Sequence, residues 1–163
     1  MTDAPTATRL RRRARIMRGV NVLMRRLLAL PFPTPLNKRL MLLTFTGRKS
    51  GRIYRQPVSY VPDGDTLLTP GGGRWTRNLR PDQPIRIKLR GRDVRAVPEI
   101  IQDPAEIGRL LQVMLVANPR LTSFVPFVRA GEDIDEAQLA AAVGHGFRII
   151  RWHLDASAVA GQH

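Results

Sequence analysis

The pattern of hydrophobic and polar positions changes near residue 36. Between residues 9 and 30, apolar side chains recur every three or four positions, and arginines occupy much of the remainder. This spacing predicts an amphipathic helix with one apolar face. Three prolines between residues 31 and 35 predict an extended connector, because proline cannot continue a helix. We therefore expect a basic N-terminal segment, residues 1–35, followed by a folded domain, residues 36–163.

Beyond residue 36 the pattern consists of short apolar runs separated by glycine, proline and aspartate. Such runs are typical of strands joined by tight turns, and residues 62–65 have the composition of a hairpin turn. Asp103 is a candidate N-cap, with Pro104 at the first helical position. The predicted strands are 40–46, 53–61, 66–69, 85–90, 94–100 and 146–154, and the predicted helical segments are 75–79, 104–117 and 136–143. The closely spaced strands favour an α+β fold, a small barrel of about six mostly antiparallel strands with flanking helices.

The charge distribution indicates an anionic partner. Of 27 basic residues, 14 lie in residues 1–55, which hold one of the 13 acidic residues, so most of the net charge of +14 belongs to this third. Nucleic acid, a lipid surface or a polyanionic small molecule would each suit this asymmetry. We expect no nucleic-acid partner, because the arginines crowd one helix with few aromatic residues and no recognition motif follows.

Composition excludes several kinds of chemistry. The chain has no cysteine, so it forms no disulfide and has no thiolate nucleophile. His145, His153 and His163 match no metal-binding spacing, and we expect no metal site; His153 is expected to be a structural, hydrogen-bonded histidine. No run of 18 apolar residues occurs, so we expect a cytoplasmic protein without a membrane-spanning helix.

The segment Gly47-Arg48-Lys49-Ser50-Gly51 is the most distinctive chemical motif. Two glycines let the backbone turn and bring its N–H groups close to a ligand. Arg48 offers a planar set of donors, Lys49 a mobile charge and Ser50 a hydroxyl, which together suit a phosphate or a carboxylate. The spacing is not that of a Walker loop. The alternative interpretation is a basic hairpin turn exposed to water.

A second glycine-rich segment covers residues 69–75 and contains three consecutive glycines. It suits a backbone that lies against a flat ligand, or a loop that must flex. Trp75 is either the wall of a cofactor pocket or a core anchor. Arg74, Arg77 and Arg80 are spaced by three, which indicates either a second anion-binding edge or a solvated face.

Four motifs occur in order between residues 40 and 98. They are Leu42-Leu43-Thr44-Phe45-Thr46-Gly47-Arg48-Lys49-Ser50-Gly51, Arg55-Gln56-Pro57-Val58, Asp63-Gly64, and the glycine loop with Trp75-x-x-Asn78-Leu79. With these motifs the chain resembles the deazaflavin-dependent nitroreductase family, split β-barrel proteins that use coenzyme F-420. The resemblance implies a deazaflavin cofactor in preference to FMN. It also implies hydride transfer to a small acceptor such as a quinone or a nitroaromatic. Split barrels of this type often form homodimers.

The resemblance also assigns roles to matching positions. The residues that would bind the cofactor phosphate and its acidic tail are Arg48, Lys49, Ser50 and Gly51. Those that would line the deazaflavin are Gln56, Pro57 and Val58, and those that would flank its ring edge are Pro70, Gly71 and Gly72. Those that would close the site are Arg74, Trp75 and Asn78. Tyr60 and Ser123 are candidates for supplying a proton, and each has a structural alternative.

Three function classes follow from these features. A deazaflavin-dependent oxidoreductase explains the four motifs, and a non-catalytic deazaflavin or flavin carrier explains them equally well. A nucleic-acid-binding module explains only the charge. The helix at residues 9–30 has two interpretations. It either contacts the inner face of an anionic membrane, or it packs its apolar side on the barrel.

These two interpretations of the N-terminal segment predict different behaviour on truncation. We expect the full chain to co-sediment with anionic vesicles, because each arginine facing the lipid contributes about 1 kcal/mol. A chain that starts at Leu36 should lose this binding and keep the cofactor, since the four motifs lie after residue 40. A truncated chain that cannot fold would instead show that the helix belongs to the core.

Overall fold

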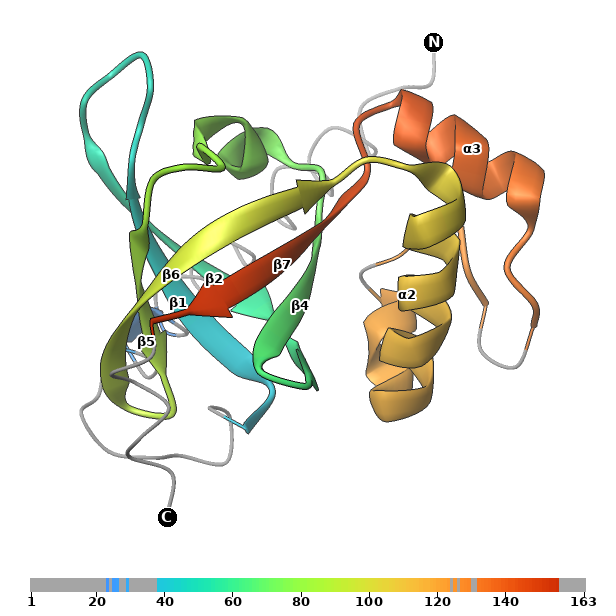
Figure 1. The fold of residues 1–163 in the computed structure, drawn as a ribbon, viewed down its shortest axis with the longest axis horizontal. Coiled ribbons are helices and arrows are strands. Elements are labelled where there is room, and N and C mark those ends of the chain that lie inside the picture. Colours follow the sequence, from blue (N-terminus) through green and yellow to red (C-terminus); the bar gives the residue numbers. More distant parts are fainter. Residues whose placement is uncertain are drawn as a thin grey trace, which may run out of the picture.

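A single curled antiparallel sheet forms the centre of the molecule in the computed structural model, which describes residues 23, 25, 26, 29, 38–123, 125, 127–129 and 132–155 (Figure 1). The predicted helix at residues 9–30 and its membrane contact lie outside the described residues, apart from four positions. Within the described part of the chain, no helix is long and apolar enough to span a membrane.

Seven strands make up the sheet, in the order β2-β1-β5-β6-β7-β4-β3, and every neighbouring pair is antiparallel. They are β1 (Leu40–Thr46), β2 (Ile53–Ser59), β3 (Val61–Asp63), β4 (Thr66–Gly71), β5 (Ile85–Leu89), β6 (Arg92–Ile101) and β7 (Arg148–Leu154). The sheet curls into a half-barrel, with the helices on one side of it (Figure 1). The predicted α+β split-barrel fold is confirmed.

The helices are α2 (Pro104–Ala117) and α3 (Glu136–Gly144), and two short 3-10 helices are η2 (Arg74–Asn78) and η3 (Pro119–Ser123). The predicted start of α2 is confirmed, because the Asp103 carboxylate accepts a hydrogen bond from the Glu106 N–H at 2.9 Å. Residues 119–123, which lie outside the predicted helical segments, form η3.

The prediction of one strand over residues 53–61 was wrong. Tyr60 still donates its N–H to the Arg39 carbonyl, at 3.0 Å, beside β1, whereas Val61 already pairs with Leu68 on β4. The chain therefore turns a barrel corner at Tyr60, which is 2% exposed. Apolar alternation continues across the corner because both sides of it face buried space, so the pattern alone could not show the break.

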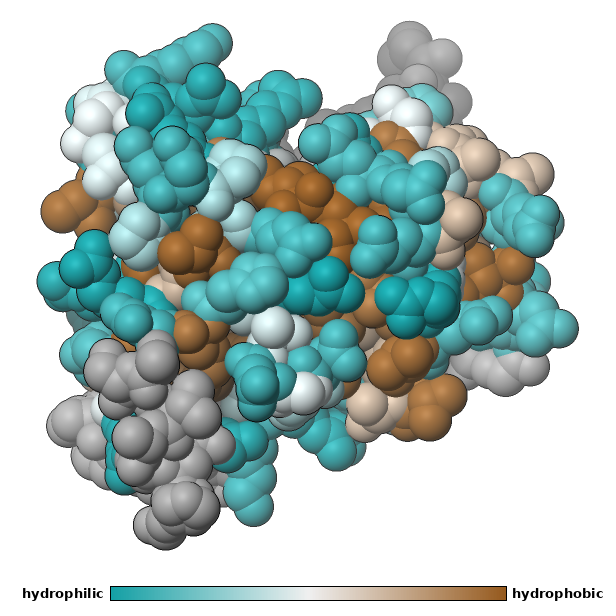
Figure 2. Space-filling model, viewed as in Figure 1, coloured by the Kyte–Doolittle hydropathy of each residue, from teal (hydrophilic) through white to brown (hydrophobic). Residues whose placement is uncertain are grey.

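The core consists of two clusters separated by the sheet. One fills the barrel and includes Met41, Phe45 and Trp152, and the other lies under the helices and includes Ile107 and Met114. Neighbouring residues of β7 face opposite clusters, with Ile149 under the helices and Ile150 in the barrel. Figure 2 shows hydrophobic surface where the barrel meets the helices and mostly hydrophilic residues at the hairpin end of the barrel.

A small ionic cluster connects β6, β7 and α2 outside this core. His153 Nε2 lies 2.7 Å from a Glu99 carboxylate oxygen, and Arg151 Nη1 lies 3.3 Å from the other. Arg151 also approaches Glu106 on α2, at 3.7 Å. The hydrogen bond with His153 lowers the pKa of the Glu99 carboxyl, with Arg151 acting in the same direction and burial opposing it. His153 therefore has the hydrogen-bonded structural position expected from the sequence.

Because the pKa of Glu99 is lower in the folded protein than its usual 4.5, its contribution to stability is present above about pH 4.5. That contribution is lost as the pH falls through the folded pKa. We expect Glu99→Gln to reduce the free energy of unfolding at pH 7 by about 0.5 kcal/mol, since the pair is half exposed. Urea denaturation should show that the difference in the free energy of unfolding between wild type and Glu99→Gln decreases from pH 7 to pH 3. Glu132→Gln is the matched control. A difference that stays constant over this pH range would contradict the stabilising role of the Glu99 carboxylate.

Candidate cofactor site

The hairpin between β1 and β2 presents the predicted phosphate-binding motif at its tip. Gly47 donates its N–H to the Arg52 carbonyl at 2.8 Å, and Gly51 donates to the Gly47 carbonyl at 3.0 Å. Gly51 has φ +65°, and a Cβ on Gly47 would lie 2.6 Å from both Ser50 Oγ and a Tyr54 ring carbon. Both glycines are thus required by the turn, which leaves residues 48–50 exposed at its tip.

Asn78 ties this turn to η2, thirty residues away in the chain. Its Oδ1 accepts the Arg48 backbone N–H at 3.0 Å, and its Nδ2 donates to the carbonyls of Arg74 and Trp75. The Arg48 guanidinium donates to the Arg77 carbonyl at 3.2 Å. The structure therefore brings Arg48 and Asn78 together, and Asn78 acts as the support that holds the turn in place.

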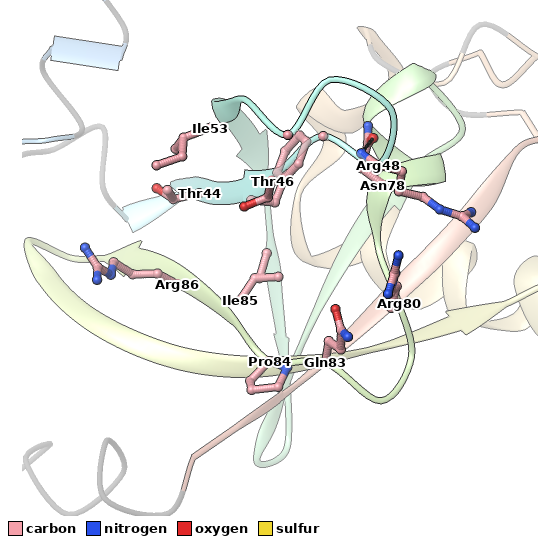
Figure 3. A pocket seen from close by; sticks show the side chains of 13 residues that line it. Thr44, Thr46, Arg48, Ile53, Asn78, Arg80, Gln83, Pro84, Ile85 and Arg86 are labelled. Carbon is pink, nitrogen blue, oxygen red and sulfur yellow. Dashed lines mark hydrogen bonds between the residues drawn. The ribbon is translucent and has the colours of Figure 1, made fainter.

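A pocket of about 600 Å³ lies between the turn, the end of η2 and the loop that leads into β5 (Figure 3). Arg48, Gly51 and Asn78 line it, as does Arg80, which the sequence placed on a candidate anion-binding edge. Arg48, Asn78 and Arg80 lie together on one side of the pocket, and Arg86 of β5 lies on the opposite side (Figure 3).

The electrostatics of the pocket favour an anion. None of its 13 lining residues is acidic, whereas Arg48, Arg80 and Arg86 are all cationic. Across the described part of the chain, none of these three arginines forms an ion pair with a carboxylate. Cations that line one cleft without a carboxylate partner raise the local concentration of an anionic ligand. A phosphate or carboxylate group therefore fits the residues present.

Other predicted cofactor residues do not line this pocket. Lys49 and Ser50 are exposed at its rim, where Ser50 Oγ lies 3.1 Å from the Tyr54 hydroxyl. Gln56, Pro57 and Val58 lie on β2, and Val58 packs into the barrel core. Trp75 is half-buried against the same core, while Arg74 is exposed beside it.

The glycine loop has a packing explanation. Pro70 and Gly71 end β4, beside β7. Gly72 has φ +128°, and a Cβ there would lie 2.9 Å from the Gly146 carbonyl oxygen. Its N–H donates to Thr76 Oγ1 at 3.0 Å. Two backbone segments therefore meet closely at Gly72, and no side chain fits between them.

The two candidate proton donors do not lie beside the turn. Tyr60 is at the opposite end of the β1–β2 pair, where its hydroxyl accepts a hydrogen bond from Arg90 Nε at 3.3 Å. It lines a separate cavity of about 130 Å³. Ser123 ends η3, which packs with α2 on the helical side of the molecule.

Sequence reasoning missed Arg86, Gln83 and Thr44 as pocket residues. Arg86 belongs to a strand that was correctly predicted, but its position opposite Thr44 depends on the β1–β5 pairing. That pairing joins segments about 40 residues apart and leaves no signal in local periodicity. The spacing of Arg74, Arg77 and Arg80 was the signal that could point to this side of the pocket.

In this split barrel, a basic turn bounded by two glycines lies beside a pocket without acidic lining residues, and this arrangement suits the phosphate of a flavin-type cofactor. The sequence profile of the F-420H(2)-dependent quinone reductase family matches residues 14–125. The match covers more than half of the chain, so the chain belongs to this family. It is accordingly an oxidoreductase whose cofactor is the deazaflavin F-420.

The chain is also similar to solved structures of low sequence identity. A candidate 5-nitroimidazole antibiotic resistance protein from Bacteroides thetaiotaomicron has 14% identity and a TM-score of 0.51, over 74% of this chain and 75% of that one. An F-420-H2-dependent reductase (FDR-A) has 13% identity and a TM-score of 0.47, over 71% and 94%. An F-420 reductase has 18% identity and a TM-score of 0.46, over 78% and 90%. No curated protein matches the sequence.

The support given by Asn78 leads to a prediction about stability. Asn78→Ala removes an acceptor for Arg48 and two donor contacts within η2. We expect it to lower the free energy of unfolding without cofactor by about 0.5–1.5 kcal/mol, because the hydrogen bond from the exposed Arg48 N–H is lost. Lys49→Ala, which changes an exposed side chain, should leave unfolding almost unchanged. Urea denaturation of both variants checks this, and equal stabilities would refute the role of Asn78.

Proposed function

We propose that this protein binds F-420 with the cofactor phosphate beneath the 47–51 turn and reduces a quinone. The observation that carries the proposal is the acid-free pocket, in which Arg48 and Arg80 face the space below the turn. Lys49 and Ser50 would complete the phosphate site from the rim, since both are exposed next to it. The role of Asn78 is then to hold the Arg48 N–H at a fixed position.

The bound cofactor supplies the hydride chemistry, and the protein binds and orients it. The pocket residues would do this with charge and hydrogen-bond donors, namely the arginine forks and the amide of Gln83. The remaining predicted residues of β2 and of the glycine loop are proposed to lie along the ring. They are Gln56, Pro57, Val58, Pro70, Gly71 and Gly72. Gln56 and Pro57 are half-buried and keep some accessible surface for this contact, whereas Val58 is buried and would support it from the core.

The description of the matching family favours a quinone among the acceptors. The acceptor would meet the cofactor at its ring, which is proposed to lie away from the phosphate pocket. We further propose a cytoplasmic protein that meets its acceptor near the membrane, and a homodimer as its assembly.

Titration of the protein with F-420 and with FMN, followed by fluorescence, tests the cofactor. We expect tighter binding of F-420, and weaker binding at higher salt because exposed charges are screened over about 8–10 Å at physiological ionic strength. Lys49→Ala and Arg80→Ala should each weaken binding by about 1–3 kcal/mol, the scale of a charge-assisted hydrogen bond. Arg120→Ala, on η3, is the matched control. Tighter binding of FMN would refute the proposal.

Turnover with the reduced cofactor tests the acceptor. A soluble quinone such as menadione should be reduced, and faster than a nitroaromatic compound of similar size. Faster reduction of the nitroaromatic compound would contradict the proposed acceptor. Tight cofactor binding without reduction of any quinone or nitroaromatic would support the carrier alternative.

A further inference from the structure

Tyr54 connects the barrel core with the tip of the 47–51 turn. Its ring stacks on Phe45 of β1, with the ring centroids 6.0 Å apart and the ring planes at 24° to each other. Phe45 belongs to the barrel core and is 6% exposed, whereas Tyr54 is 44% exposed. The hydroxyl of Tyr54 lies 3.1 Å from Ser50 Oγ. One side chain of β2 thus reaches from the core to a residue that is predicted to bind phosphate.

The turn is packed tightly around this contact. Ser50 Oγ and a ring carbon of Tyr54 each lie 2.6 Å from the position that a Cβ on Gly47 would take. The ring of Tyr54 therefore lies directly against the backbone of the turn. Tyr54 does not line the pocket of about 600 Å³, so removing its hydroxyl leaves the pocket lining unaltered. Its contact with Ser50 is how Tyr54 can affect an anion bound at the turn.

The hydrogen bonds at Ser50 Oγ determine what this hydroxyl can offer a ligand. A serine hydroxyl has one proton to donate and two lone pairs that accept. The Arg52 N–H donates to Ser50 Oγ at 3.3 Å and occupies one of these lone pairs. Either hydroxyl can be the donor between Ser50 and Tyr54, and the phenol is the more acidic of the two, which favours donation by Tyr54. With Tyr54 as donor, both lone pairs of Ser50 Oγ are occupied.

We propose that Tyr54 is a positioning residue for the cofactor phosphate, and that it acts by leaving the Ser50 hydroxyl free only to donate. This inference rests on the proposed function, which places Ser50 at the phosphate. A hydroxyl that already accepts two hydrogen bonds meets the next group as a donor, and phosphate oxygens are acceptors. Hydrogen bonds in a chain polarise one another, so the bond from Tyr54 also makes Ser50 a stronger donor. Stacking on Phe45 holds the phenol in place before the cofactor binds.

Tyr54→Phe tests this role, because it keeps the stacked ring and removes only the hydroxyl. In a fluorescence titration we expect the variant to bind F-420 about two- to tenfold more weakly, the scale of one hydrogen bond. Its melting temperature without cofactor should match that of the wild type, since the lost bond is exposed. Tyr60→Phe removes a hydroxyl at the opposite end of the β1–β2 pair and is the matched control, with wild-type affinity expected. Unchanged affinity of Tyr54→Phe would overturn the proposal.

A double-mutant cycle with Ser50 separates positioning from general support of the turn. In a Ser50→Ala background, Tyr54→Phe should cause no further loss of F-420 affinity, because the hydroxyl through which Tyr54 acts is absent. In a Ser50→Thr background, which keeps a hydroxyl, Tyr54→Phe should weaken binding as it does in the wild type. If the losses caused by Tyr54→Phe and Ser50→Ala add, Tyr54 does not act through Ser50 and the proposal is wrong.

The outcomes separate this inference from the proposed function. If the wild type binds no F-420, or if Lys49→Ala and Arg80→Ala keep full affinity, the phosphate is not at the turn and both proposals fail. If these two variants bind weakly while Tyr54→Phe binds like the wild type, the phosphate site stands and the role of Tyr54 is wrong. The deazaflavin alcohol, which lacks the phosphate, is the second probe. An equal loss of affinity for F-420 and for this alcohol in Tyr54→Phe would place Tyr54 at the ring and overturn its role toward the phosphate.

Discussion

The site depends on the bond between the Arg48 backbone N–H and the Asn78 side chain. A hairpin tip of exposed residues has few apolar contacts to hold it, so its position relative to the barrel has to come from directed bonds. Asn78 provides one such bond and is itself fixed by two contacts within η2. The pocket lies between these two segments and so takes its shape from this one amide.

Charge is used in two opposite ways in the molecule. Around Glu99, basic and acidic side chains from β6, β7 and α2 are matched, and they join elements distant in sequence. Around the pocket below the turn, Arg48, Arg80 and Arg86 form no ion pair with a carboxylate of the described residues. The first arrangement joins elements of the fold, and the second leaves the pocket with an excess of positive charge. This difference distinguishes the pocket more sharply than the net charge of the whole chain does.

Local features of the sequence were sufficient for most elements. The apolar run of β1 and the capping residues of α2 act within a few positions, and both segments were predicted with the bounds that the structure has. The break at Tyr60 and the pocket position of Arg86 depend on which strands pair, a property of the whole sheet. The glycine loop shows the same limit, because the requirement for Gly72 comes from Gly146, far along the chain. The resemblance to deazaflavin enzymes gave the cofactor, but not the contacts made by each residue.

Pro57 has a further consequence for how copies of this chain can meet. Of the strands that the structure describes, β2 is at one edge of the sheet, and Arg52 and Tyr60 beside it both bond toward β1. Hydrogen bonding alternates along an antiparallel strand, so odd-numbered residues, including Pro57, direct their backbone outward. Proline offers no N–H there, and an added strand would lose a bond at the middle of the edge. Pro57 thus makes this edge a poorer site for the addition of a strand from another copy of the chain.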